Sequence, residues 1–248
     1  MIHKKSREEI KLMKEAGRIV ALVHNEMKNI IKPGISTYEL DKIAHDIIRD
    51  NKAFPTFLGY NGFPATICAS INEQVVHGIP SKDTILKDGD VISIDVGATF
   101  KGLVGDGAWT YGVGEINSAN QKLLNATEEA LMSAIKKIKN GINLDEVVGE
   151  IEDVAKANNL GIVRQYGGHG VGRNMHEEPF VFNYRTGSKV ILKSNMAVAI
   201  EPMLNLGCDD VYVLEDDWTV VTKDHKPSAH FEHTILVTDD GAEILTKI

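Results

Sequence analysis

The sequence has little cysteine, no long apolar run and no excess of positive charge. Two cysteines, Cys68 and Cys208, occur in 248 residues. They are too few for a disulfide framework, so we expect a reducing compartment, the cytoplasm. No apolar stretch approaches the roughly 20 residues that span a bilayer, and no membrane contact is expected. The formal net charge of −8 leaves no basic field that could hold nucleic acid directly.

Several common catalytic signatures are absent as well. The chain has no G-x-S-x-G nucleophile elbow and neither a Walker A nor a G-x-G-x-x-G phosphate loop. It also lacks H-E-x-x-H and C-x-x-C, which are frequent zinc signatures. Cys68 lies in the apolar run TICASIN, which favours a buried structural thiol over a nucleophile.

A faint internal repeat organises the chain, which we expect to form a single catalytic domain over residues 1–248. Residues 32–50 read KPGISTYELDKIAHDIIRD, and residues 139–157 read KNGINLDEVVGEIEDVAKA. Each copy follows an amphipathic helical pattern, roughly 6–31 and 119–139. Each then has a Gly-Ile turn, a capping residue (Ser36 or Thr37; Asn143) and a second predicted helix. Such patterns can also resemble one another by chance.

A strand-like segment follows the helices in each half. Residues 88–98 place Asp95 on one strand face, and residues 193–203 place Glu201 on a comparable face, 106 residues further on. The pattern predicts an α+β fold of two equivalent halves, roughly 1–115 and 116–248, with helix pairs covering a curved, mostly antiparallel sheet. Two such halves would bring the carboxylates together at the centre.

Four acidic residues lie in apolar, strand-like surroundings. They are Asp95, Asp106, Glu201 and Glu232, with Asp106 reached across a predicted hairpin that contains Gly102 and Gly105. Any one of them could be a solvent-facing strand residue. Four together are harder to explain, because ionised carboxylates in apolar surroundings need pairing or a metal, and like charges need a cation between them.

Three histidines lie in glycine-containing segments. His169 is flanked by glycines at 167, 168 and 170, which allow close approach of backbone and ligand. His176 lies seven residues later, and His77 precedes Gly78. A lone histidine is more often structural than a ligand, so this pattern by itself leaves both roles open.

Four carboxylates and one imidazole form an oxygen-rich ligand set. Such a set favours manganese, iron(II) or cobalt, with zinc as a further possibility, over a thiolate-type zinc site. Five ligands with bridging carboxylates suit two divalent metal ions, which together lower the pKa of a bridging water and polarise a carbonyl. The residues therefore predict metal-assisted hydrolysis, but they do not identify the substrate.

Five segments resemble the type I methionine aminopeptidases, metallopeptidases of the pita-bread fold. These segments are FLGYNGFPATICASINEQVVHGIP (57–80), VISIDVGATFKGLVGDGAWT (91–110), YGGHGVGRNMHEEP (166–179), AIEP (199–202) and SAHFEHT (228–234). The resemblance implies removal of an initiator methionine that precedes a small residue. It also accounts for the repeat, because the halves of that fold are related by a pseudo-twofold axis.

The resemblance implies a role for each site residue. Asp95 and Asp106 would chiefly hold one metal, His169 and Glu201 the other, with Asp106 and Glu232 bridging. Glu201 would pass on the proton of the water, while His77 and His176 would hold the scissile amide and stabilise the tetrahedral intermediate. The methionine pocket would consist of Tyr60, Phe63, Cys68 and Trp218, with Phe57 and Met175 near the rim. Met175 departs from the aromatic residue of many relatives, which puts pocket shape and inhibitor preference in question.

Two rival functions share the fold. One is an X-Pro aminopeptidase or prolidase, which usually carries an additional N-terminal domain for which this chain has no room. The other is a non-catalytic pita-bread binding protein, which the intact ligand set argues against. Only 31 residues separate Glu201 from Glu232, too few for the insertion of the type II enzymes. The resemblance implies a monomer acting on nascent polypeptide N-termini at the ribosome.

Overall fold

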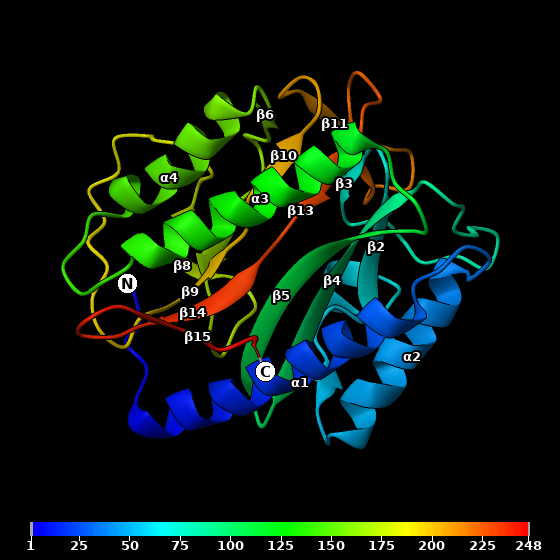
Figure 1. Ribbon diagram of the computed structural model, residues 1–248. Coiled ribbons are helices and arrows are strands. Elements are labelled where there is room, and N and C mark those ends of the chain that lie inside the picture. The colour runs from blue at the N-terminus through cyan, green and yellow to red at the C-terminus, as the bar shows by residue number, and fades with distance from the viewer. Residues whose placement is uncertain (1, 248) are drawn as a thin grey trace.

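The computed structural model describes residues 2–247 as two helix pairs packed on antiparallel strands (Figure 1). The helices are α1 (Arg7–Ile30), α2 (Thr37–Asp50), α3 (Ser118–Lys137) and α4 (Leu144–Ala157), with a short 3₁₀ helix at Tyr60–Gly62. In Figure 1 the first pair lies at one side of the strands and the second pair at the other. The helices thus match the predicted ranges.

Local capping explains where the helices begin. Ser6 accepts a hydrogen bond from Glu9 N, and the Glu9 side chain accepts one from Ser6 N, which forms a capping box for α1. Ser36 and Glu39 do the same for α2. Asn143 caps α4 by accepting from the backbone of Asp145. Ser36, not Thr37, is therefore the capping residue.

Every strand pairing among the described residues is antiparallel, and the strands form four sheets. One sheet has the order β1-β4-β2 with β5 (Leu103–Gly112) paired to β4 (Val91–Phe100), and another has the order β15-β14-β9-β7-β8. Two three-stranded sheets, β13-β10-β6 and β11-β12-β3, complete the set. The other strands are β1 (Phe54–Pro55), β2 (Ile67–Ile71), β3 (Gln74–Val76), β6 (Gly161–Ile162), β7 (Gly168–Gly170), β8 (Glu177–Val181), β9 (Ala197–Ile200), β10 (Met203–Asn205), β11 (Val211–Val213), β12 (Val220–Thr222), β13 (Ser228–His230), β14 (His233–Val237) and β15 (Ala242–Ile244).

The internal repeat is visible in the backbone hydrogen bonds. Gly34 N donates to Leu86 O and Gly141 N to Leu192 O, each at 2.8 Å. Both glycines have positive φ, 93° and 88°, where a side chain would be strained. Each half has its own buried apolar cluster, one between α1, α2 and β4, the other between α3, α4 and the C-terminal strands. The division of the chain near residue 115 stays a prediction.

No helix within residues 2–247 combines the length and the apolar composition needed to cross a membrane.

Candidate metal centre

A cavity of about 280 Å³ is lined by residues from both halves of the chain. All thirteen predicted site positions meet there, although they span positions 57 to 232 of the sequence. The lining includes Phe57, Tyr60, Phe63, Cys68, His77, Asp95, Asp106, His169, Met175, His176, Glu201, Trp218 and Glu232. The cavity thus combines apolar and aromatic side chains with carboxylates and imidazoles.

Two of the four carboxylates lie within strands, and the other two lie in connections between strands. Asp95 lies in β4 and Asp106 in β5, while Glu232 lies between β13 and β14. Glu201 was predicted to lie within a strand, but β9 ends one residue earlier, at Ile200. Pro202 has no amide hydrogen to donate, so strand pairing stops there and resumes with β10 at Met203. Its backbone carbonyl accepts a hydrogen bond of 3.1 Å from the Asn183 side chain.

The predicted hairpin between Asp95 and Asp106 is present and contains both glycines. Gly102 lies in the turn between β4 and β5, with φ of 80°, but Gly105 lies inside β5. A Cβ atom at Gly105 would be 2.6 Å from the backbone nitrogen of Gly17 in α1. Gly105 therefore serves close packing of helix on strand.

Three of the carboxylates each have an oxygen without a hydrogen-bond partner within residues 2–247. Six buried side-chain polar atoms have no hydrogen-bond partner within the described part of the chain, and four lie in this cluster: Asp95 Oδ1, Asp106 Oδ1, Glu232 Oε1 and His230 Nε2. Burial, with the charges of Asp106 and Glu201, raises the pKa of Asp95 and of Glu232 well above normal. Orphaned acceptors that repel one another when ionised fit bound cations.

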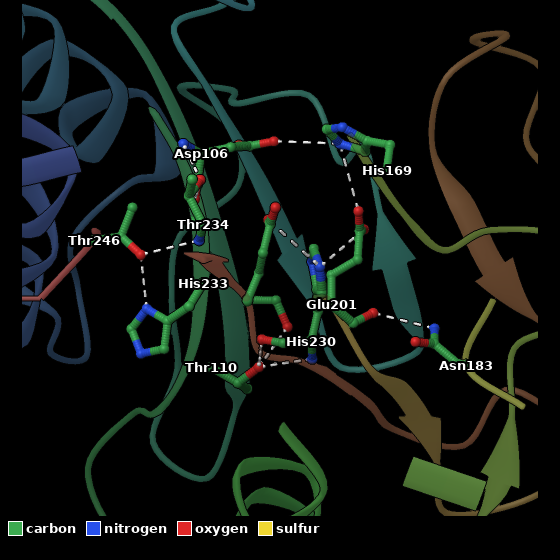
Figure 2. Close-up of polar contacts among 12 residues, drawn as sticks. Asp106, Thr110, His169, Asn183, Glu201, His230, His233, Thr234 and Thr246 are labelled. Carbon is green, nitrogen blue, oxygen red and sulfur yellow. Dashed lines mark hydrogen bonds and ion pairs between the residues drawn. The ribbon is translucent and has the colours of Figure 1, made fainter. Parts of the chain in front are cut away.

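His169 is oriented as a ligand would be. Its Nδ1 lies 2.9 Å from Gly170 O and donates to it, so Nε2 is the nitrogen that faces the carboxylates and would bind a cation in its deprotonated form. Nε2 lies 3.5 Å from Asp106 Oδ2 and 3.6 Å from Glu201 Oε1. Figure 2 marks both contacts with dashed lines. Burial alone lowers the pKa of His169, but the hydrogen bond with Asp106 and the charge of Glu201 raise it to about 9.

The glycines around His169 are required by close packing. A Cβ atom at Gly168 would lie 2.1 Å from Ala199 O, and one at Gly170 would lie 2.2 Å from Glu178 O. Both distances are far shorter than any real contact of a Cβ atom, so only glycine lets β7 approach its neighbours β9 and β8. The predicted close approach of backbone is thus observed, whereas close approach of a ligand stays a prediction.

Two groups of possible ligand atoms emerge, and both contain Glu232. Asp106, His169 and Glu232 form one, and Glu201, His230 and Glu232 form the other. Asp95 falls outside both groups, but it lines the same cavity. His230 was missed from the sequence because SAHFEHT was read only for its glutamate. The alternation of His230 and Glu232 was the available signal.

His77 and His176 lie on the aromatic side of the cavity. His77 has φ of 60°, a strained value for a residue with a side chain, and it is the first residue after β3. Its ring packs edge-on against Trp218 and Tyr166. His176 shares a 2.9 Å hydrogen bond with the Tyr60 hydroxyl through Nδ1. Burial lowers the pKa of His77 to about 4, so its imidazole is neutral near pH 7.

The apolar residues predicted for the methionine pocket surround one end of the cavity. Phe63 and Trp218 pack edge to face with centroids 5.1 Å apart. Cys68 is buried in β2, and burial raises its pKa well above normal, which leaves it a thiol. Phe57 and Met175, expected near the rim, are only 7% and 6% exposed and belong to the buried wall.

Residues 11–239 match the sequence profile described as metallopeptidase family M24. The chain belongs to metallopeptidase family M24. Among curated members, methionine aminopeptidase 1 of Bacillus subtilis (strain 168) is 50% identical over 249 residues, which cover 100% of both chains. The methionine aminopeptidase of Escherichia coli K12 is 44% identical over 98% of this chain and 92% of its own.

Solved structures of M24 enzymes show the same fold. The methionine aminopeptidase of Thermotoga maritima superposes with a TM-score of 0.98 at 45% identity, covering 100% of both chains. The Xaa-Pro dipeptidase of Bacillus anthracis has a TM-score of 0.76 at 24% identity and covers 99% of this chain but 62% of its own. The pita-bread α+β fold is thereby confirmed, and the X-Pro alternative is not favoured.

Proposed function

We propose that this chain is a methionine aminopeptidase that hydrolyses the bond after an N-terminal methionine when the second residue is small. The main support for the proposal is that one cavity contains both a buried cluster of carboxylates and an aromatic pocket. The full-length identity to methionine aminopeptidases supports the same activity. A pocket without a cation site, or a cation site without a pocket, would not suit this reaction.

The proposed metal ligands are Asp95, Asp106, His169, Glu201 and Glu232. Asp95 and Asp106 would chiefly hold one divalent ion, His169 and Glu201 the other, and Asp106 and Glu232 would bridge. The oxygen-rich set suits Co²⁺, Mn²⁺ or Fe²⁺, with Zn²⁺ also possible. When bound, the two ions would supply an acidic water and a polarised carbonyl, in the manner of other dinuclear hydrolases.

The remaining steps belong to side chains of the chain itself. Glu201 would accept the proton of the attacking water and pass it to the leaving amine. Although burial raises it, the neighbouring imidazoles of His230 and His169 lower the pKa of Glu201, which keeps this carboxyl ionised and able to accept a proton. His77 and His176 would hydrogen-bond the scissile amide and the oxyanion that forms from it.

The aromatic end of the cavity would select methionine. Phe63, Trp218, Cys68 and Met175 offer apolar or polarizable surface to a thioether, with favourable sulfur–aromatic contacts. Tyr60 contacts His176 through its hydroxyl and would couple the pocket to the amide-binding group. Phe57 closes the wall behind them.

The test is hydrolysis of matched peptides after reconstitution with each metal. Protein loaded with Mn²⁺ or Co²⁺ should release methionine from Met-Ala-Ser, and not from Met-Lys-Ser or from X-Pro peptides. Cleavage of X-Pro peptides with Met-Ala-Ser left intact would refute the assignment of specificity. No hydrolysis of any peptide, with two metals bound, would favour a non-catalytic binding protein.

Two alanine variants, one at His77 and one at His225, test whether His77 contacts the substrate or binds metal. His77→Ala should retain both metals and lose most turnover, because His77 is assigned to the substrate. His225→Ala changes an exposed histidine outside the cavity lining and should match the parent protein. Loss of metal from His77→Ala would make His77 a ligand and overturn its assigned role.

We further propose that the chain works as a monomer on nascent N-termini at the ribosome, in the cytoplasm, where initiator methionine is first exposed. Sedimentation with translating ribosomes and a single protomer mass in light scattering are the expected results. A stable dimer, or activity confined to released peptides, would contradict this part of the proposal.

A further inference from the structure

His230 has no role among the five proposed ligands and the two substrate histidines, yet it lies at the centre of the site. Its side chain is 2% exposed, and its Nε2 has no hydrogen-bond partner within the part of the chain that the structure describes. Nε2 lies 3.4 Å from Glu201 Oε2 and 4.0 Å from Glu232 Oε2. A buried imidazole nitrogen aimed at two carboxylates without bonding either of them calls for an explanation.

The spacing fits shared ligation better than a hydrogen bond. A charge-assisted N–H···O bond spans roughly 2.7–2.9 Å. Two ligand atoms about 2.1 Å from one ion are separated by roughly 3.0–3.4 Å when they subtend 90–110° at it. His230 stands 3.4 Å from one oxygen of Glu201, and the proposed ligand His169 stands 3.6 Å from the other. The two imidazoles thus flank Glu201 in the same way (Figure 2).

The repeat relates His230 to the proposed ligand Asp106. Asp106 N donates to Thr234 Oγ1 at 3.0 Å, and that hydroxyl donates back to Asp106 O at 2.8 Å. His230 N donates to Thr110 Oγ1 at 2.9 Å, and that hydroxyl donates back to His230 O at 2.8 Å. Thr110 follows Asp106 by four residues and bonds the backbone of His230. Thr234 follows His230 by four residues and bonds the backbone of Asp106. This exchange is what a local twofold axis produces.

Other contacts extend the same axis. Val113 N donates to Asp90 O, and Gly89 N donates to Val113 O, each at 2.9 Å. Val237, which lies 124 residues after Val113, makes the equivalent two bonds. Val237 N donates to Met196 O, and Asn195 N donates to Val237 O, each at 2.9 Å. The same step of 124 leads from Asp106 to His230. His230 therefore holds the place in the second half that a metal ligand holds in the first.

We propose that His230 is a further metal ligand of this chain, which binds one of the two ions through Nε2 together with Glu201 and Glu232. The inference rests on the proposed dinuclear site. It makes the second half of the site richer in nitrogen than the five-ligand set, with two imidazoles in place of one. A nitrogen-richer position favours later first-row metals over manganese.

The test compares variants of His230 for metal binding, independently of activity. His230→Gln keeps an amide donor at nearly the same reach but removes the imidazole, whereas His230→Leu removes both. If His230 is a ligand, calorimetric titration of metal-free protein with Co²⁺ should show one of two binding steps weakened by about 100-fold or lost in both variants. X-ray absorption of the Co²⁺-loaded parent should count two imidazoles per two ions, and one in His230→Gln.

His233→Gln is the matched control. His233 lies three residues away, but its ring turns from the carboxylates and shares a 2.8 Å hydrogen bond with Thr246 (Figure 2). Its metal binding should equal that of the parent.

Three outcomes would overturn parts of the reasoning separately. Full metal affinity in His230→Gln together with lost affinity in His230→Leu would make His230 a hydrogen-bond donor to Glu201, not a ligand. One imidazole per two ions in the parent would refute the ligand role directly. A parent protein that binds no divalent metal would refute the dinuclear site itself, and the proposed function with it.

Discussion

The buried ion pair between Lys5 and Glu177 links the N-terminal segment to the loop that carries His176. Lys5 Nζ lies 2.6 Å from Glu177 Oε2, with side chains 2% and 15% exposed. The other oxygen of Glu177 accepts the backbone amides of Arg173 and Asn174, at 2.9 and 3.2 Å. Replacing Lys5 by Met leaves the Glu177 carboxylate buried without its counter-ion. We expect this change to destabilise both the fold and the loop.

The size of the effect follows from the pair's environment. Removing one partner of a buried pair costs about 3–5 kcal/mol. We take about 3 kcal/mol, because Glu177 retains two amide donors and some solvent. A chain of 248 residues gains roughly 0.5 kcal/mol per kelvin of unfolding entropy near its midpoint, so Tm should fall by about 6 °C. Lys4→Met changes an exposed neighbour and should shift Tm by about 1 °C or less.

The assay is thermal unfolding of both variants, paired with peptide hydrolysis. Lys5→Met should also lower kcat, since the loop ahead of His176 loses its anchor, whereas Lys4→Met should not. Lys5→Met/Glu177→Gln should recover part of the lost stability because no unpaired charge remains. Equal Tm values for the two lysine variants, or no recovery in the double variant, would refute the reasoning.

The pair should respond to pH in a defined direction. Although burial raises it, the bond from Lys5 and the amides of Asn174 and Arg173 lower the pKa of Glu177. A carboxyl with a lowered folded-state pKa contributes stability above its unfolded pKa of about 4.3 and loses it as pH falls through the folded value. The stability difference between Lys5→Met and the parent should therefore shrink at acid pH.

Three further predictions concern stability. Removing the metal with a chelator should lower Tm. Adding metal back at 100 times its Kd should raise the free energy of unfolding by about 2.7 kcal/mol for each site, or Tm by roughly 5 °C. An unchanged Tm would contradict tight binding. Gly105→Ala should lower the unfolding free energy by about 3 kcal/mol in denaturant titration, because its Cβ would meet the Gly17 backbone at 2.6 Å. Burial lowers the pKa of His24 to about 4, so stability should fall as pH drops from about 6.5 towards 4, by up to about 3 kcal/mol. His24→Gln should flatten that slope; an unchanged slope would assign it to other groups.

Local signals explain why the helices could be predicted from the sequence. The capping residues Ser6, Ser36 and Asn143 each act within four positions of their own helix, so the pattern that predicts them also contains their partners. The Gly-Ile turns are equally local, and both glycines have positive φ, which suits a turn. The carboxylates stood out because charge in a strand-like apolar run is unusual.

Partners distant along the chain account for what could not be predicted. Lys5 and Glu177 are 172 positions apart, and neither looks unusual in its own segment. Glu201 was placed in a strand because alternation continues through it, whereas Pro202 ends the pairing. The equivalence of His230 and Asp106 was hidden by a second offset. The helices and first strands of the two halves are offset by 106 or 107 residues, but the strands that carry Asp106 and His230 are offset by 124.

The same offset explains why the site is asymmetric although the backbone repeats. It pairs Ala108 with Glu232, and these residues touch, since Glu232 N donates to Ala108 O at 2.8 Å. Residues in contact across a twofold axis compete for the same volume, and Ala108 is only 1% exposed. A second carboxylate at position 108 would therefore add a negative charge to a cluster in which several oxygens already lack hydrogen-bond partners. One glutamate on the axis can reach ligands of both halves, which matches the presence of Glu232 in both groups of ligand atoms. The duplication thus supplies two equivalent backbone scaffolds. Because only one of the two equivalent positions, 108 and 232, carries a carboxylate, the two halves share a single metal centre.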